Sequence, residues 1–166
     1  MKKNAVFLLM LIFAFGQAVI AQDFSTAGGS SGEKKMAVSM GMEFNMNARE
    51  NFAGGAVLSF DYNLPFARPF ALGLNFTYSN NFSGIAVLEP AAMFRMYFSG
   101  NRHEGLFAQA DLGTYIVLEE QEDDLMFLGG VRAGIRVPMG NFYVEPYGRL
   151  GYPFAFGIGI TAGMGF

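Results

Sequence analysis

Cysteine is absent from this chain of 166 residues, and so is tryptophan. An exported protein without cysteine has no disulfide framework, and it lacks the acylated cysteine of a lipoprotein. Charged residues are scarce: they make up 15% of the sequence, against about 25% in an ordinary soluble domain. The high apolar content (52%) excludes a disordered chain. The formal charge of -3 disfavours nucleic acid as a partner.

Long hydrophobic runs are also missing from most of the chain. After residue 21, no apolar run approaches the roughly 18 residues that a membrane-spanning helix requires. A protein that crosses a membrane with several helices is therefore excluded, although half of the residues are apolar. The length of the chain fits a single domain.

Residues 1–21 have the features of a cleaved secretory signal peptide. Lys2 and Lys3 precede an apolar stretch from Ala5 to Phe15, and Val19-Ile20-Ala21 leads to an expected cleavage before Gln22. The alternative is an uncleaved N-terminal anchor, for which the apolar stretch is short. We therefore expect an exported protein.

Residues 22–34 are small and polar, and we expect them to form a flexible leader. The predicted domain, residues 35–166, is dominated by an alternation of apolar and polar or small residues, which is typical of β-strands. The alternation appears in eight segments, near residues 36–46, 56–64, 70–78, 88–98, 106–116, 127–137, 142–150 and 156–166. Eight strands joined by short turns predict an antiparallel up-and-down arrangement.

The charged residues of these segments follow the same alternation. Each lies on the face opposite to the apolar residues, and none lies on the apolar face. These residues are Glu43, Asp61, Glu89, Arg95, Asp111, Arg132, Arg136, Glu145 and Arg149. Four arginines nearly balance five carboxylates, as a partly dry interior requires, because an unpaired buried charge is strongly destabilising. We interpret these residues as a charge network in the interior of a barrel.

Alternation alone permits two barrels of opposite polarity. In a soluble barrel of the lipocalin type the apolar face points inward, whereas in an outer-membrane barrel it meets lipid and the polar face fills the interior. The polar face here is mostly Gly, Ala, Ser, Thr and Asn, its basic residues are all Arg, and the chain ends on the apolar-face residue Phe166. These features favour an all-β, eight-stranded antiparallel up-and-down transmembrane β-barrel, a fold that satisfies every backbone group in lipid.

Two segments resemble strands of known barrels. Phe-Gly-Ile-Gly-Ile-Thr-Ala-Gly-Met-Gly-Phe, residues 156–166, resembles the terminal recognition signal of bacterial outer-membrane barrels, with Phe166 as the final aromatic. Residues 142–152 are similar to the Pro-Tyr-x-x-x-Gly-Tyr strand of small eight-stranded barrels of the OmpA, OmpX and OmpW type. The resemblance implies location in the outer membrane, insertion by the barrel-assembly machinery and periplasmic termini. The outer loops, near residues 47–53, 80–83, 119–124 and 152–154, would then be very short.

Two Glu-Pro pairs place an inward carboxylate beside a proline in mid-strand. These are Glu89-Pro90 and Glu145-Pro146. They are compatible with a charged gate in a pore or with a salt-bridge network that plugs the barrel. The second interpretation is favoured because an eight-stranded barrel is just wide enough for its side chains to fill it. Each proline also removes a donor from the ladder, so we expect a bulge or a broken hydrogen bond there.

No motif in the sequence predicts an enzyme, a metal site or a cofactor site. The single histidine, His103, falls in a connection that the implied topology places at the periplasmic end, away from the outer leaflet where a lipid hydrolase would need its base. One outer turn is rich in carboxylates but matches no defined calcium loop. We interpret it as a solvated turn, with weak divalent bridging to headgroups as the alternative. Its residues are Glu119, Glu120, Glu122, Asp123 and Asp124.

The sequence therefore predicts a non-enzymatic, integral outer-membrane protein with a largely plugged interior, serving envelope structure or weak surface interaction. The alternative is a narrow channel for small or apolar solutes, because the glycines of residues 157–165 leave one side of the interior bare. Four tyrosines could fill that space: Tyr97, Tyr115, Tyr143 and Tyr147. We expect a monomer whose partners are outer-membrane lipid and, during insertion, the barrel-assembly machinery.

Overall fold

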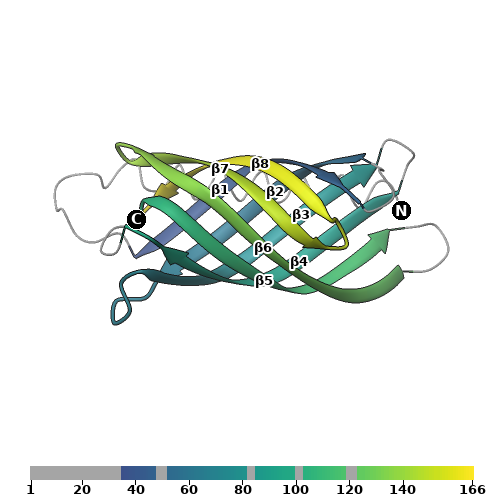
Figure 1. Cartoon of the computed structure of the whole chain (residues 1–166), viewed down its shortest axis with the longest axis horizontal. Helices are drawn as coiled ribbons and strands as arrows, with labels where there is room; N and C mark the ends of the chain where they lie inside the picture. Colours follow the sequence, from purple (N-terminus) through teal and green to yellow (C-terminus); the bar gives the residue numbers. More distant parts are fainter. Residues whose placement is uncertain (1–34, 48–51, 82–84, 100–102, 119–122) are drawn as a thin grey trace. The chain divides into compact units, whose positions relative to one another are not determined.

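The computed structural model describes residues 35–47, 52–81, 85–99, 103–118 and 123–166. The predicted signal peptide and leader lie outside these residues. The described chain forms eight strands (Figure 1): β1 (Met36–Met46), β2 (Phe52–Asn63), β3 (Phe70–Asn81), β4 (Ala86–Tyr97), β5 (Gly105–Leu118), β6 (Asp123–Met139), β7 (Phe142–Tyr152) and β8 (Phe156–Gly165).

The strands form a closed barrel in which each strand pairs with its neighbours in the sequence and β8 pairs with β1. All of these pairings are antiparallel. The predicted all-β, eight-stranded, up-and-down barrel is confirmed. Within the described ranges, no helix has the length and apolar character needed to cross a membrane.

Several strands extend farther than the alternation predicts. β2 begins at Phe52 and β3 ends at Asn81, inside segments that were predicted as loops. β6 begins at Asp123, which pairs with Leu118, so Asp123 and Asp124 are strand residues and their assignment to a turn is wrong. Ladder hydrogen bonds use main-chain groups, so a strand can continue past its last apolar residue. Alternation in the sequence marks only the part of a strand that has an apolar face.

The register sets the inclination of the strands, which run obliquely in Figure 1. One circuit of paired residues around the barrel starts at Met36 and returns to β1 at Met46, ten residues farther along. The path is Met36, Tyr62, Leu72, Phe94, Ala110, Val131, Leu150, Phe156 and Met46. Such a stagger inclines the strands by roughly 35–45° and leaves a lumen that side chains can fill.

The barrel has an apolar outer wall and a polar interior. Large apolar side chains such as Met42, Leu112 and Ile158 are exposed on the outside. Side chains at alternate positions, among them Ser59, Asn75 and Thr161, are buried inside. This is the reverse of a water-soluble fold, in which the polar residues cover the surface.

Both mid-strand prolines interrupt a ladder without changing its register. The pairing of β4 with β5 stops at Leu88 and resumes at Ala91 in the same alignment. That of β6 with β7 stops at Gly134 and resumes at Val137, again in the same alignment. No residue has been inserted into either strand, so the expected disturbance is a local break rather than a bulge. The missing pairs contain Pro90 and Pro146.

A glycine lies opposite the residue that follows each proline: Gly113 faces Ala91, and Gly134 faces Tyr147. A Cβ atom at Gly134 would lie 2.5 Å from the backbone oxygen of Pro146 and 2.7 Å from the Cβ of Tyr147. Real Cβ atoms do not approach other atoms so closely. The strands can therefore come together at this point only because residue 134 has no side chain.

We predict that Gly134→Ala destabilises the barrel by about 1–3 kcal/mol through overpacking. The matched control is Gly148→Ala, because a Cβ at Gly148 would meet only the oxygen of Gly157, 4.0 Å away. The free energy of unfolding in urea, measured for both variants in lipid vesicles, checks the prediction. Equal stabilities of the two variants would contradict it.

Candidate functional site

The nine charged residues of the predicted interior network are all buried, and each is at most 5% exposed. They come from β1, β2, β4, β5, β6 and β7. The nine are Glu43, Asp61, Glu89, Arg95, Asp111, Arg132, Arg136, Glu145 and Arg149. Alternation along each inclined strand directs them into the lumen, where they form two clusters at different heights.

The first cluster, here called the terminus-side cluster, lies toward the end of the barrel that holds Lys35 and Phe166. It consists of Asp61, Arg95, Arg136 and Glu145. The Glu145 carboxylate accepts hydrogen bonds from Arg95 Nη1, at 2.8 Å, and from Arg136 Nε. Arg136 also contacts Asp61, with 3.0 Å between Nη2 and Oδ2. Two guanidinium groups thus balance two carboxylates.

Aromatic rings surround the arginines of the terminus-side cluster. The guanidinium carbon of Arg136 lies 3.9 Å from the ring centroid of Tyr143, and that of Arg95 lies 4.3 Å from the centroid of Phe107. Cation–π contacts of this kind stabilise a guanidinium that is removed from water. Tyr97 and Phe107 also pack together in an apolar group. This end of the lumen is filled by rings as well as by ion pairs.

The second cluster lies toward the opposite end of the barrel, here called the loop end, and is named the loop-side cluster. It is centred on Glu43, whose two carboxylate oxygens have four partners. Oε1 accepts hydrogen bonds from Arg149 Nη1 at 2.7 Å and from Asn45 Nδ2 at 2.8 Å. Oε2 accepts one from the Tyr147 hydroxyl at 2.7 Å and lies 3.4 Å from Arg132 Nη1. This single side chain therefore joins β1 to β6 and β7 across the lumen.

Two further carboxylates complete the loop-side cluster. Arg132 Nε donates to Asp111 at 2.8 Å, and Arg149 Nη2 donates to Glu89. The cluster thus holds three carboxylates and two guanidinium groups. Glu89 is the least satisfied of the three, because its Oε1 atom has no hydrogen-bond partner among the described residues.

Gln109 joins the two clusters. Its Oε1 accepts a hydrogen bond from Arg95 Nε at 2.8 Å, and its Nε2 donates to Asp111 at 2.7 Å. The nine charges and this amide therefore form one connected network. The sequence places Gln109 on the polar face, but nothing in its residue type identifies it as the link.

A group of buried apolar side chains lies next to the loop-side cluster. Ala91, Tyr115 and Leu128 are buried together, with Val87 and Val117 packed against them. The alternation did not predict Leu128 or Phe107 inside the barrel, because each is an apolar residue on the polar face of its strand. The charged layer thus lies between apolar or aromatic groups on both sides.

Two tyrosines occupy the space that the glycines of β8 leave open. A Cβ atom at Gly159 would overlap the ring of Tyr147, and one at Gly163 would overlap the ring of Tyr143. The tyrosines and glycines are therefore complementary in size. Of the other two candidate tyrosines, Tyr97 packs in the terminus-side aromatic group and Tyr115 in the loop-side apolar group.

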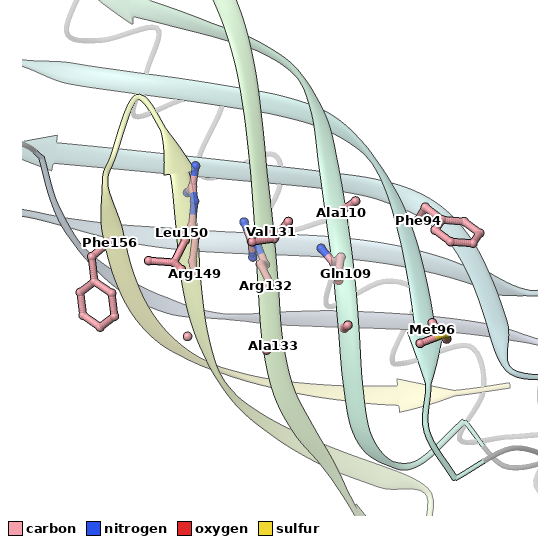
Figure 2. A pocket seen from close by; sticks show the side chains of 12 residues that line it. Phe94, Met96, Gln109, Ala110, Val131, Arg132, Ala133, Arg149, Leu150 and Phe156 are labelled. Atoms are coloured by element: carbon pink, nitrogen blue, oxygen red, sulfur yellow. The ribbon is translucent and has the colours of Figure 1, made fainter.

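A hollow of about 610 Å³ lies on the outer wall between β4 and β8. Its floor includes Ala108, Ala133 and Gly148, which pair across β5, β6 and β7. Figure 2 shows larger apolar side chains around this floor, among them Phe94 and Phe156. Gln109, Arg132 and Arg149 also line the hollow, although they are buried residues of the interior network.

The remaining candidate residues are His103 and the acidic segment of residues 119–124. No set of three or more His, Cys, Asp or Glu residues is placed to hold a metal ion in the part of the chain that the structure describes. The ring of His103 packs edge-on against Tyr97, with 5.4 Å between ring centroids. Glu119, Glu120 and Glu122 of the acidic turn lie outside the described residues.

We predict that Glu43→Gln destabilises the barrel by about 3 kcal/mol, because it removes one of two carboxylate partners from both Arg132 and Arg149. Glu89→Gln is the matched control, and we expect a loss of about 1 kcal/mol or less, because Glu89 contacts one arginine, Arg149, which keeps Glu43 as a partner. Urea unfolding in lipid vesicles, followed by tyrosine fluorescence, measures both. A larger loss for Glu89→Gln would refute this ranking.

No protein-family model and no curated protein matches the sequence. Solved structures match the fold. The crystal structure of Neisserial surface protein A (NspA) has a TM-score of 0.55 and 11% identity, over 79% of this chain and 96% of that one. A de novo designed transmembrane β-barrel has a TM-score of 0.50 and 13% identity, over 83% of this chain and all of that one. At these identities the likeness establishes the fold, an eight-stranded barrel similar to those of membrane proteins.

Proposed function

We propose that this chain is an integral outer-membrane protein with an interior closed to solutes, acting without catalysis in envelope structure or weak surface interaction. The observation that supports the proposal is the set of side chains that point into the lumen. A connected network of nine buried charges lies between an apolar group on the loop side and an aromatic group on the terminus side. Such an interior would make the barrel rigid and leave little room for a bound substrate or for ion conduction.

The outer wall supports a position in lipid. Every charged strand residue whose side chain is described lies inside the barrel. The outward residues are apolar around the barrel and mostly large, with small ones such as Ala108, Ala133 and Gly148 at the floor of the hollow. A continuous apolar surface of this extent on a protein in water leads to association, whereas lipid satisfies it.

Aromatic side chains are gathered toward both ends of the outer wall. Near the loop end these are Phe44, Phe52, Phe127, Tyr152 and Phe156. Near the terminus end they are Tyr62, Phe98, Phe142 and Phe166. The wall between the two groups is mainly aliphatic, as at Leu74 and Ile160, although Phe60 and Phe94 are also exposed there. Two aromatic girdles that flank an aliphatic band are typical of membrane barrels, and Phe and Tyr form them here because Trp is absent.

The last residue of the chain is well ordered in the closing seam of the barrel. Phe166 N donates to Met36 O at 2.9 Å, and Met36 N donates to Phe166 O at 3.0 Å. This position is consistent with a terminal strand that the barrel-assembly machinery recognises and then closes against β1. We accordingly propose export through a cleaved signal peptide, insertion by that machinery, and a monomer surrounded by outer-membrane lipid.

The alternative of a narrow channel has lost its main support. That hypothesis depended on a bare interior surface along β8, and Tyr143 and Tyr147 occupy the space beside the glycines there. The closed interior is therefore the better proposal.

A pair of substitutions on β6 tests the membrane position. Val131 is 54% exposed on the middle of the outer wall, and Met139 is 64% exposed at the end of the strand. We predict that Val131→Arg destabilises the barrel in vesicles by roughly 2–4 kcal/mol, and Met139→Arg by about 0–1 kcal/mol, because the cost of arginine in lipid depends on depth. If water surrounded the barrel, both variants would be tolerated equally, and their urea unfolding curves would coincide.

Planar-bilayer recordings of the purified protein test the closed interior. We predict no stable unitary currents from a preparation that is demonstrably folded by its heat-modifiable mobility on gels, since the charges are paired and the lumen is filled. Stable currents that change on Arg132→Ala or Arg149→Ala would refute the closed interior and favour the channel.

A further inference from the structure

The turn between β2 and β3 presents an unusually exposed aromatic side chain. Residues 64–69, Leu-Pro-Phe-Ala-Arg-Pro, project from the barrel end that holds Phe166 (Figure 1). Phe66 is 85% exposed, more than any other large apolar side chain among the described residues. A single exposed apolar side chain is common on protein surfaces, so the surroundings of Phe66 decide what it can bind.

Main-chain hydrogen bonds define the turn that carries Phe66. Leu64 N donates to Phe70 O at 2.9 Å, Phe70 N donates to Ala67 O at 2.8 Å, and Ala67 N donates to Leu64 O at 3.2 Å. Proline residues at both flanks restrict the backbone further. A preorganised turn loses little conformational freedom when its side chain binds something.

The charge of the turn is positive. Arg68 is exposed two residues after Phe66, and the turn contains no acidic residue. Lys35, also exposed, is adjacent, because its carbonyl oxygen accepts a hydrogen bond from Asn63 N at 2.7 Å at the end of β2. Glu104, the acidic side chain described at this end, belongs to a different turn, between β4 and β5.

The turn is continuous with the apolar outer wall. Tyr62 on β2 and Leu72 on β3 are exposed on that wall, directly before and after the turn. If the wall lies in lipid, residues 64–69 reach the layer of phospholipid headgroups. An aromatic ring suits the boundary between the acyl chains and the headgroups, and a guanidinium group pairs with phosphate through two hydrogen bonds.

We propose that residues 64–69 form a binding site for anionic phospholipid headgroups, in which Phe66 enters the interfacial layer and Arg68 pairs with the lipid phosphate. The site rests on the proposed membrane function. It anchors one edge of the barrel at a defined depth, and it gives the terminus end a preference for anionic phospholipid. A protein partner for the same turn is the competing occupant.

The absence of tryptophan makes the test direct, because Phe66→Trp introduces the single indole of the chain. The variant is reconstituted into vesicles of phosphatidylcholine with phosphatidylglycerol, and the indole is quenched either by lipids brominated near the interface or by acrylamide in water. We expect strong quenching by the brominated lipids, protection from acrylamide and a blue-shifted emission. Adding Arg68→Gln lowers the ratio of lipid-embedded to water-exposed indole roughly fivefold.

Phe142→Trp, on the outer wall at the same end, is the control that separates the two proposals. If its indole is quenched by the brominated lipids while that of Phe66→Trp is open to acrylamide, the barrel is inserted and the headgroup site is refuted. The turn would then be free for a protein partner. If neither indole is quenched by lipid, the proposed membrane function itself fails. If Phe66→Trp is quenched equally in vesicles of phosphatidylcholine alone, and Arg68→Gln has no effect, the preference for anionic lipid is refuted.

Discussion

The rest of the structure depends on the mutual neutralisation of guanidinium and carboxylate groups inside the barrel. Each of these groups is buried, so each needs a partner of opposite charge, and removing one partner typically costs about 3–5 kcal/mol. The stagger of the barrel brings those partners together. Glu43 of β1 meets Arg132 of β6 and Arg149 of β7 because β8 closes against β1 with the observed offset. Closure of the sheet and pairing of the charges therefore support one another.

Differences in side-chain size complement the pairing of charge. The tyrosines of β7 lie over the glycines of β8, and the glycines opposite Ala91 and Tyr147 let the strands approach where a proline interrupts the ladder. Glycine is often treated as a source of flexibility, but in this interior it provides space for a neighbouring ring or carbonyl group. Large and small side chains therefore fit together around the buried charges.

The sequence was sufficient to predict the eight strands and the face of most of their residues, because alternation has a period of two in any strand. Glu43 and Arg149 could be assigned to the interior on this basis alone. Their contact could not be predicted, because height in the lumen depends on the register of every strand pair around the circuit. The linking role of Gln109 was not predicted, because the search for the network considered charged residues and Gln109 is neutral. The interior position of Leu128 was not predicted, because a single apolar residue on the polar face does not change the alternation. The start of β6 at Asp123 was missed because main-chain pairing needs no apolar side chain.

The interruption between β6 and β7 has a consequence for what holds these two strands in alignment. In the shared register Arg136 stands opposite Glu145, and this is one of the pairs missing from the ladder. Yet the two side chains are joined by their own hydrogen bond, from Arg136 Nε to Glu145. Where proline removes a main-chain link, a side-chain link takes its place. The two strands are therefore joined at this point by an ion pair between side chains. A single substitution of Arg136 or Glu145 can remove that link. A main-chain hydrogen bond elsewhere in the ladder is lost only if its N–H group is replaced by proline.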